Sequence, residues 1–283
     1  MIRLNAMPLD FTPRRKILPQ LPKYVDPRGY SHIVEMSEFE SAFLCGALKT
    51  FRPKKILEVG VSAGGSTVII LQALEDLGAS YEMHSIDLLQ NFWRNPKYPT
   101  GFLATFAKEN VFGNLRGTHK FHIGKILPQV IDEIGGGVDF VILDTAHVLP
   151  GEPLDFLAVL PYLTDEAVVV LHDVSLHQYG TTNSQATGVL LSAVTADKFL
   201  NFQPDDELFR YPNIAAFKVN EHTAANVENV FLSLTLRWEY FPYRQLLIYQ
   251  QHYRRFYADA LCEIFQEAVD MNAYNFWLEE QRK

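Results

Sequence analysis

Short apolar runs alternate with segments of helical spacing through the middle of the chain. The apolar runs have the length of strands and lie at residues 55–59, 81–86, 119–123, 139–143 and 167–171. The segments between them place their apolar residues three and four positions apart, which is the pattern of amphipathic helices. Apolar strands joined by helices are typical of a parallel sheet that is covered on both faces. We therefore expect an α/β fold with a Rossmann-like, doubly wound, mostly parallel sheet.

Local signals mark the ends of the predicted helices. Ser37 and Glu40 form a capping box at the start of the first helix, and Pro53 follows its end. The next helix is predicted over residues 66–77, where Gly78 ends it. Further helices are expected up to about residue 110 and over residues 126–134, 153–163 and 187–195.

The pattern changes after Asp173. Two short apolar runs, 198–202 and 214–219, predict an antiparallel last strand that closes the sheet. From residue 222 onward we expect a C-terminal helical extension rich in aromatic residues. These aromatics either pack as core and interface or form a wall over a substrate pocket.

The N-terminal segment contains five prolines within its first 31 residues. Spaced prolines exclude a long helix, so we expect an extended arm that lies on the domain or reaches a partner subunit. The chain is thus divided into an extended N-terminal arm (1–34), an α/β domain (35–220) and a helical C-terminal extension (221–283).

Composition and charge narrow the classes of partner. The chain has 283 residues, with 25 basic and 33 acidic side chains, and its net charge of −8 disfavours nucleic acid as a ligand. Cys45 and Cys262 each lie in an apolar helical pattern and are predicted to be buried thiols in a reducing compartment. No secretory signal or membrane-spanning stretch is recognised, so we expect a cytoplasmic protein without a membrane partner. The N-terminal arm and the aromatic helices suggest a homo-oligomer.

The most informative motif is ILEVGVSAGGST, at residues 56–67. An acid inside a strand, then a glycine-rich turn and a helix start, is typical of a nucleotide-type ligand site. Asp87 ends the next strand, where a doubly wound fold places the acid that binds a ribose. A dinucleotide site requires G-x-G-x-x-G, and Ser62 occupies the position of the second glycine. An NAD(P)-linked or nucleotide-sugar oxidoreductase is therefore a secondary hypothesis.

The E-x-G-x-x-x-G order of this motif resembles motif I of the class I S-adenosylmethionine-dependent methyltransferases. The segments DFVILDTAH (139–147) and AVVVLHDV (167–174) resemble strands of the small-molecule O-methyltransferases, the group that includes catechol O-methyltransferase. The similarity is greatest to bacterial members acting on sugars and natural products, and it covers roughly residues 37–219. It implies that 35–220 is a methyltransferase domain with S-adenosylmethionine as cofactor.

The resemblance also implies a set of cofactor-binding residues. The methionine part of the cofactor would lie among Glu58, Gly60, Ser62, Gly64 and Ser66. The ribose hydroxyls would bind to Asp87, and the chain at Gly124 would pass the adenine. A purely structural role for Glu58, as an acid bonded to the loop amides, is compatible with this assignment.

Acids at two further strand ends carry the expected chemistry. In the catechol-type enzymes the positions of Asp144 and Asp173 bind a divalent cation, usually magnesium, and His172 is a further candidate metal ligand. The family's third ligand, an amide side chain, is replaced here by Val174. His147 lies where those enzymes carry their catalytic lysine, and we expect it to be the general base, with a role as metal ligand as the alternative.

The sequence thus predicts transfer of a methyl group to a hydroxyl of a small molecule, either a sugar, a natural product or a phenolic, assisted by a divalent cation. One alternative is a metal-independent methyltransferase in which Asp144 and Asp173 hold the acceptor and orient His147. Another is a non-catalytic binding or assembly protein on the same fold. Burying so many unpaired acids is costly, which argues against a purely structural role.

Overall fold

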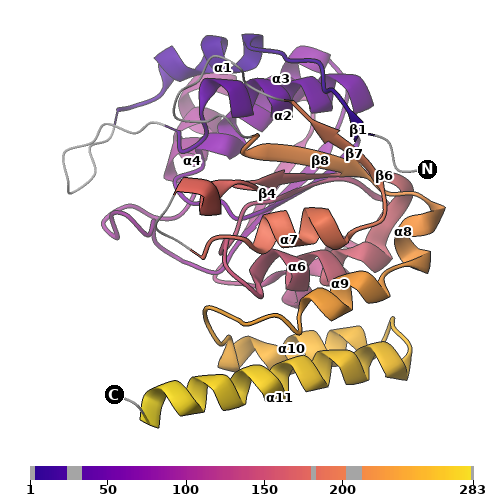
Figure 1. Cartoon of the computed structure of the whole chain (residues 1–283). Coiled ribbons are helices and arrows are strands. Elements are labelled where there is room, and N and C mark those ends of the chain that lie inside the picture. The colour runs from indigo at the N-terminus through magenta and orange to yellow at the C-terminus, as the bar shows by residue number, and fades with distance from the viewer. Residues whose placement is uncertain (1–3, 24–33, 180–182, 202–211, 282–283) are drawn as a thin grey trace.

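The computed structural model describes residues 4–23, 34–179, 183–201 and 212–281, and a sheet of eight strands lies at the centre of this part of the chain (Figure 1). The strands are β1 (Leu4–Asn5), β2 (Lys55–Val59), β3 (Glu82–Asp87), β4 (Thr118–Ile123), β5 (Val138–Leu143), β6 (Leu163–His172), β7 (Asp197–Leu200) and β8 (Ile214–Lys218). Their order across the sheet is β1-β7-β8-β6-β5-β2-β3-β4.

The strand directions confirm the predicted doubly wound fold. The pairs from β4 through β3, β2 and β5 to β6 are all parallel, whereas β8 is antiparallel to both β6 and β7. The last strand of the chain is therefore inserted out of sequence order. The winding reverses between β2 and β5, and ligands in such sheets bind at the carboxyl ends of the strands beside this reversal.

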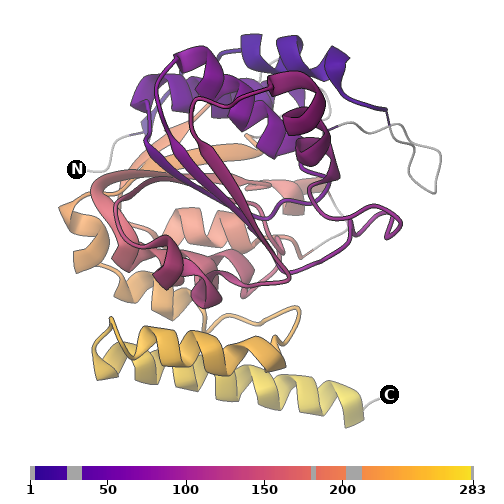
Figure 2. The same cartoon turned by 180° about the vertical axis from the view of Figure 1, so that it is seen from behind.

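Helices cover both faces of the sheet (Figure 1). One face carries α1 (Thr12–Ile17), α2 (Glu38–Phe51), α3 (Gly65–Leu77) and α4 (Phe102–Ala107), and the other carries α5 (Ile131–Ile134), α6 (Gly151–Val159), α7 (Ala186–Ala193) and α9 (Glu228–Ser233). The short helix α8 (Glu221–Ala225) precedes α9, and α10 (Tyr243–Tyr253) and α11 (Asp259–Gln281) form an outer layer beyond α6 and α9 (Figure 2). Short helical turns complete the fold: η1 (Leu18–Gln20), η2 (Lys108–Phe112), η3 (Leu127–Gln129), η4 (Leu160–Tyr162) and η5 (Leu176–Tyr179).

The central strands carry apolar side chains on both faces, so an apolar core lies on each side of the sheet. Successive side chains of a strand point to opposite faces, so Ile56 packs with α2 and α3 while Leu57 packs with the α6 face. In β6, Val168 and Val170 likewise belong to the first core, and Val169 belongs to the second. Both cores are closed by helices, so the polar strand ends are the part of the central strands that is left for ligands.

The N-terminal segment differs from the expected extended arm. Residues Thr12–Ile17 form α1, with Pro13 in its first turn, where proline's missing N–H costs nothing. Residues Leu4–Asn5 form β1 and pair with β7 at the edge of the sheet. The expectation of an extended form is thus wrong for Thr12–Ile17, whereas the strand β1 is extended and lies on the domain. Residues 24–33 of the predicted arm lie outside the described residues.

Other element boundaries shift by a few residues. The helix expected over 126–134 is divided into η3 and α5, and the helix expected over 153–163 begins at Gly151 and ends in η4. Helix α4 continues into the π-helical turn η2. The strand expected over 198–202 spans Asp197–Leu200, and residue 202 lies outside the described part. The predicted C-terminal helical extension is confirmed as α8 to α11.

Candidate active site

The carboxyl ends of β2, β3, β5 and β6 open into a cavity of about 580 Å³. The glycine loop between β2 and α3 lines one half of it, which we call the cofactor half after the role predicted from the sequence. The strand ends at Asp144 and Asp173 and residues of the C-terminal extension line the other half, which we call the acceptor half for the same reason. The lining includes Gly60, Ser62, Ser66, Asp87, Lys125, Ile126, Asp144, His147, Asp155, His172, Asp173, Tyr240, Gln245 and Tyr249.

Gly60 is required where the two halves meet. Its φ of +97° lies in the left-handed region, and a Cβ built on it would stand 1.8 Å from the backbone oxygen of Asp144. The turn after β2 therefore runs directly against the end of β5, which only glycine permits. This close approach brings the cofactor half and the acceptor half into one cavity.

Glu58 lies beneath the glycine loop and is fully buried. Its carboxylate accepts hydrogen bonds from Ser66 Oγ at 2.7 Å, Thr67 Oγ1 at 2.8 Å and Ser85 Oγ at 2.6 Å. Burial outweighs these bonds and raises the pKa of Glu58 to about 7. Because Glu58 does not line the cavity, its contacts fix the first turn of α3 from behind.

Asp87 lines the cofactor half and organises the glycine loop. Its Oδ2 accepts hydrogen bonds from the amides of Val61 at 2.9 Å and Ser62 at 3.0 Å, and its Oδ1 accepts one from Leu89 at 2.8 Å. A carboxylate oxygen has more than one acceptor site, so these bonds leave capacity for ligand hydroxyls. The amides hold the Asp87 carboxylate at the mouth of the loop.

The other predicted cofactor residues divide into two groups. Gly60, Ser62 and Ser66 line the cavity, whereas Gly64 and Gly124 do not. Gly64 packs against Gly101 and Ala104, where a Cβ would meet backbone at 3.0 Å. Gly124 turns the chain with φ +76°, and Lys125 and Ile126, which follow it, reach the cavity instead.

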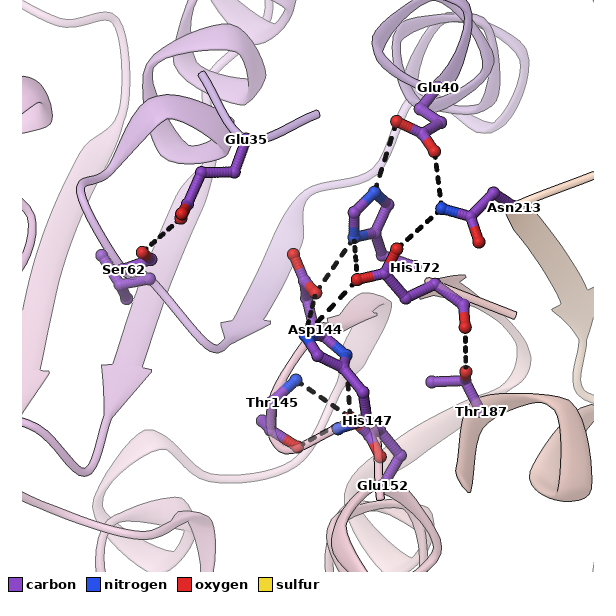
Figure 3. A network of polar contacts seen from close by, with 12 residues as sticks. Glu35, Glu40, Ser62, Asp144, Thr145, His147, Glu152, His172, Thr187 and Asn213 are labelled. Atoms are coloured by element: carbon purple, nitrogen blue, oxygen red, sulfur yellow. Dashed lines mark hydrogen bonds and ion pairs between the residues drawn. The ribbon is translucent and has the colours of Figure 1, made fainter. Parts of the chain in front are cut away.

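A polar contact also crosses the cofactor half. Ser62 Oγ donates a hydrogen bond to Glu35 (Figure 3). The other carboxylate oxygen of Glu35 pairs with Arg94 Nε at 2.5 Å. The Arg94 guanidinium lies 4.2 Å from the centre of the Trp93 ring. The segment before α2 and the loop after β3 thereby meet across the glycine loop.

In the acceptor half, the structure brings together all four predicted residues at the ends of β5 and β6 (Figure 3). His172 Nδ1 lies 3.1 Å from Asp144 Oδ1 and 3.5 Å from Asp173 Oδ2. His147 Nε2 lies 3.4 Å from Asp173 Oδ2 and 3.8 Å from Asp144 Oδ1. Asp144, His147 and Asp173 each offer one ligand atom within 4.8 Å of the others, and all three face the cavity.

His172 lies deeper than the other three, with 5% of its surface exposed. Burial alone would lower its pKa, but the carboxylates of Asp144, Asp173 and Glu40 outweigh burial and raise the pKa well above the usual range. The carboxylates thus favour the protonated imidazole, in which both ring nitrogens are donors.

Glu40 and Asn213 complete the buried network behind His172. Glu40 is 5% exposed, and its Oε2 lies 3.5 Å from His172 Nε2. Asn213 Nδ2 donates to Glu40 Oε1 at 2.8 Å and to Asp173 Oδ1 at 2.7 Å. Burial would raise the pKa of Glu40, yet the His172 cation lowers it to about 2.

His147 is fixed by Glu152 in an unusual backbone conformation, with φ +60°. Glu152 is fully buried, and its Oε1 accepts hydrogen bonds from the His147 amide at 2.8 Å and the Thr145 amide at 3.1 Å. The same oxygen lies 3.6 Å from His147 Nδ1. Among the described residues, neither His147 Nδ1 nor Glu152 Oε2 has a hydrogen-bond partner.

Sequence reasoning missed several of these residues. A signal was available for Glu152 and Asp155, because two acids three positions apart in an otherwise apolar helix call for a partner at that face. No local sequence pattern assigns Glu40 or Asn213 to the site, because both reach it from distant segments of the chain. His177, the next imidazole along the chain after His172, is exposed and does not line the cavity.

Comparison with known proteins agrees with this geometry. A family model described as a methyltransferase domain matches residues 57–174, the stretch that holds the glycine loop, Asp87, Asp144, His147 and Asp173. No curated protein sequence matches the chain. This match agrees with the methyltransferase domain that the sequence predicts.

Solved structures with a similar fold are more distant. The O-methyltransferase TomG of Streptomyces achromogenes, in complex with S-adenosylmethionine, is 20% identical with a TM-score of 0.48, over 66% of this chain and 82% of its own. A putative caffeoyl-CoA O-methyltransferase of Staphylococcus aureus is 12% identical with a TM-score of 0.43, over 73% and 90%. An O-methyltransferase of Bacillus cereus is 14% identical with a TM-score of 0.44, over 67% and 84%.

None of the helices in the described part of the chain has the length and apolar character to cross a bilayer.

The buried network predicts how stability depends on pH. The pKa of Glu40 is about 2 in the folded protein against an ordinary value of 4.5. A carboxyl whose pKa is lowered by folding stabilises the protein above its ordinary pKa, and this stabilisation is lost as the pH falls toward 2. Glu40→Gln is therefore expected to lower the free energy of unfolding at pH 7 by at most about 3 kcal/mol. Urea unfolding at pH 7 and pH 3 should show the difference from wild type shrinking at the lower pH.

Glutamine suits the capping position of Glu40, so the helix start is preserved in this variant. Glu38→Gln is the matched control, because Glu38 lies on the same helix with a side chain that is 51% exposed. It should leave stability nearly unchanged. A Glu40→Gln effect of the same size at both pH values would contradict the assigned charge network.

Proposed function

We propose that this protein transfers the methyl group of S-adenosylmethionine to a hydroxyl group of a small-molecule acceptor. The observation that carries this proposal is the single cavity that joins the glycine loop and Asp87 to Asp144, His147 and Asp173. A methyl transfer requires cofactor and acceptor to lie side by side with a base at the acceptor oxygen. One cavity with a cofactor half and a base-bearing half provides this arrangement.

In the cofactor half, the residues of this chain bind and orient. Asp87 accepts hydrogen bonds from the ribose hydroxyls, and the amides at the start of α3 face the carboxylate of the methionine part. Ser66 Oγ is already committed as a donor to Glu58, so its backbone N–H is the group available to that carboxylate. The cofactor supplies an activated methyl group that is ready for displacement.

In the acceptor half, His147 takes the proton from the acceptor hydroxyl at Nε2. For this task the proton on the ring must be on Nδ1, and the buried Glu152 oxygens are the acceptors on that side. Glu152 is thus a positioning residue that selects the productive tautomer. The positive φ of His147, held by the bond from its amide to Glu152, aims the ring into the cavity.

A divalent cation fits the acids at this position. Asp144 and Asp173 present carboxylate oxygens to the cavity, and hard oxygen donors suit magnesium. His147 Nε2 lies 3.4 Å from Asp173 Oδ2, but as the base it keeps its lone pair for the proton, and His172 is a cation that positions the two carboxylates. Our assignment of the ligands therefore differs from the sequence expectation at His172. When bound, the ion would lower the pKa of the acceptor hydroxyl.

Cofactor binding is the first test of this function. Asp87→Asn keeps the volume of the side chain but removes its charge, and charge-assisted hydrogen bonds contribute about 1.5–3 kcal/mol. We therefore expect its dissociation constant for S-adenosylmethionine to rise by roughly 10- to 100-fold, as measured by isothermal titration calorimetry. Asp165→Asn, a surface acid that does not line the cavity, should bind as wild type does. Absence of binding to the wild-type protein would overturn the proposed function.

Turnover tests the base. His147→Ala is expected to lower kcat by about 10²- to 10⁴-fold, the usual contribution of a general base, while the affinity for S-adenosylmethionine stays within a factor of three. Release of S-adenosylhomocysteine, followed by mass spectrometry with a methylated acceptor, measures the rate. His222→Ala, at an exposed histidine of α8, is the matched control. Wild-type turnover in His147→Ala would remove His147 from its role.

Metal removal tests the ion. Chelator-treated protein is expected to retain its affinity for S-adenosylmethionine, since Asp144 and Asp173 belong to the acceptor half, and to lose at least 10-fold in kcat. Added magnesium should restore the rate in wild type but not in Asp173→Asn. A rate that is indifferent to chelation and to added ions would favour the metal-independent alternative, in which the two acids hold the acceptor directly.

A further inference from the structure

The C-terminal extension forms part of the wall of the acceptor half. Tyr240, Pro242, Gln245 and Tyr249 line the cavity together with Asp144 and Asp173. The chain enters this wall beside the acceptor site, because the Glu239 amide bonds to the Leu149 oxygen at 3.0 Å. The C-terminal aromatics were expected either to pack in the core or to form a wall over a pocket. Tyr240 and Tyr249 belong to the wall of the cavity. Trp238, Tyr253 and Phe265 are buried in the core.

Specific hydrogen bonds hold this wall against α6. Tyr253 Oη donates to the Leu154 oxygen at 2.7 Å, Tyr257 Oη donates to the Leu157 oxygen at 2.6 Å, and His252 Nε2 lies 2.9 Å from the Ala158 oxygen. These three bonds follow one face of α6 along its length. The extension is therefore fixed relative to the strand ends, and side chains on α10 can act as a rigid part of the acceptor site.

Asp155 on α6 is the polar centre of this wall. It is 6% exposed, lines the cavity, and accepts a hydrogen bond on Oδ1 from Tyr249 Oη at 2.6 Å. Its Oδ2 lies 3.3 Å from Thr145 Oγ1, which also lies 3.1 Å from Glu152. Because a threonine hydroxyl has one proton, it serves only one of the two acids at a time. Asp155 thus keeps acceptor capacity inside the cavity.

The environment of Asp155 favours a ligand that donates hydrogen bonds. Burial, reinforced by Glu152 and opposed by the bond from Tyr249, raises the pKa of Asp155 to about 7. The ionised form of a carboxyl that is buried in this way is stabilised by any hydroxyl or ammonium group that donates a hydrogen bond to it. Among the described residues no lysine or arginine lines this half, and the His172 cation lies against Glu40, Asp144 and Asp173 instead.

The distribution of charge disfavours an anionic group beside Asp155, because the divalent cation proposed above would balance Asp144 and Asp173 and not this acid. Arg94 and Lys125 are the lining lysine and arginine residues of the described chain, and both lie in the cofactor half. Arg94 is moreover paired with Glu35. The acceptor half instead presents the acids Asp144, Asp155 and Asp173. A phosphate or carboxylate on the acceptor would therefore lie next to acids with no lysine or arginine to balance it.

We propose that Asp155, held by Tyr249, is the specificity-determining residue for the acceptor and binds a second hydroxyl or an ammonium group on it. The acceptor is accordingly a polyhydroxylated compound or an amino alcohol that carries no anionic group. This inference rests on the proposed function and adds the chemical class of the acceptor. It also gives the C-terminal extension a role in choosing the substrate.

Two matched sets of probes test the proposal. The catechol set carries a side chain that ends in a hydroxyl (hydroxytyrosol), an ammonium (dopamine) or a carboxylate (3,4-dihydroxyphenylacetate). The sugar set consists of the methyl glycosides of glucose, glucosamine and glucuronic acid. Methylation is measured with the wild-type protein at saturating S-adenosylmethionine and with magnesium. Within each set, kcat/KM for the carboxylate probe should be at least 10-fold below kcat/KM for the hydroxyl probe and for the ammonium probe. The ratio of hydroxyl to ammonium members shows which of the two donors Asp155 prefers.

Variants then connect this selectivity to the residue. Asp155→Asn preserves the hydrogen bond from Tyr249 but removes the charge. It should therefore lower kcat/KM for the ammonium probes at least 10-fold and reduce the ratio of their kcat/KM to that of the anionic probes. Tyr249→Phe should reduce the same ratio of kcat/KM values by a smaller factor. Asp165→Asn should match wild type, and all three variants should bind S-adenosylmethionine as wild type does. A purely structural role for Asp155 would lower all rates together without changing their ratios.

The outcomes separate the two proposals. Equal or faster methylation of the anionic probes, or unchanged ratios in Asp155→Asn, would overturn the assigned acceptor class. Failure of all six probes with a protein that binds S-adenosylmethionine would also overturn it and leave the proposed function standing. Failure to bind S-adenosylmethionine would instead overturn the proposed function itself.

Discussion

The pairing of β2 with β5 is the constraint on which the rest of the site depends. Their register sets Val59 beside Leu143, and the Asp144 amide continues the ladder by donating to the Val59 oxygen at 2.9 Å. The turn at Gly60 then passes so close to Asp144 that a Cβ has no room. Parallel neighbours this far apart in sequence need helical crossovers on both faces. Those crossovers leave the carboxyl ends of the strands open, and the glycine loop and the acids meet there.

Buried charge is the second organising element. Taking a carboxylate out of water is costly unless a cation or hydrogen bonds compensate. Here His172 lies among Glu40, Asp144 and Asp173, whose carboxylates favour its protonated form, so a buried opposite charge holds the two acids that face the cavity. Asp173 has φ +59°, a strained conformation for a non-glycine residue, which the Asn213 and Thr187 hydrogen bonds help to maintain. Strain and paired charge together position the acceptor half before any ligand binds.

The sequence allowed the central sheet and the strand-end residues to be predicted, because both depend on local patterns. Fully apolar runs mark buried strands, and an acid directly after such a run must lie at the carboxyl edge of the sheet. Other features arise only when distant segments pack. Asn213 reaches Glu40 and Asp173 from the start of β8, and Tyr249 reaches Asp155 only because α10 docks on α6. Helix α1 escaped prediction for a different reason: six residues with a proline in the first turn carry too weak a periodic signal.

We propose that one cavity holds the cofactor and the acceptor on either side of the β2–β5 junction. A crystal structure of the protein with S-adenosylhomocysteine tests it most directly. We expect the ribose at Asp87, the amino-acid part at the start of α3, and the sulfur on the side of the cavity that faces His147 and Asp144. Density for the ligand elsewhere, or a sulfur pointing away from the acceptor half, would contradict the account.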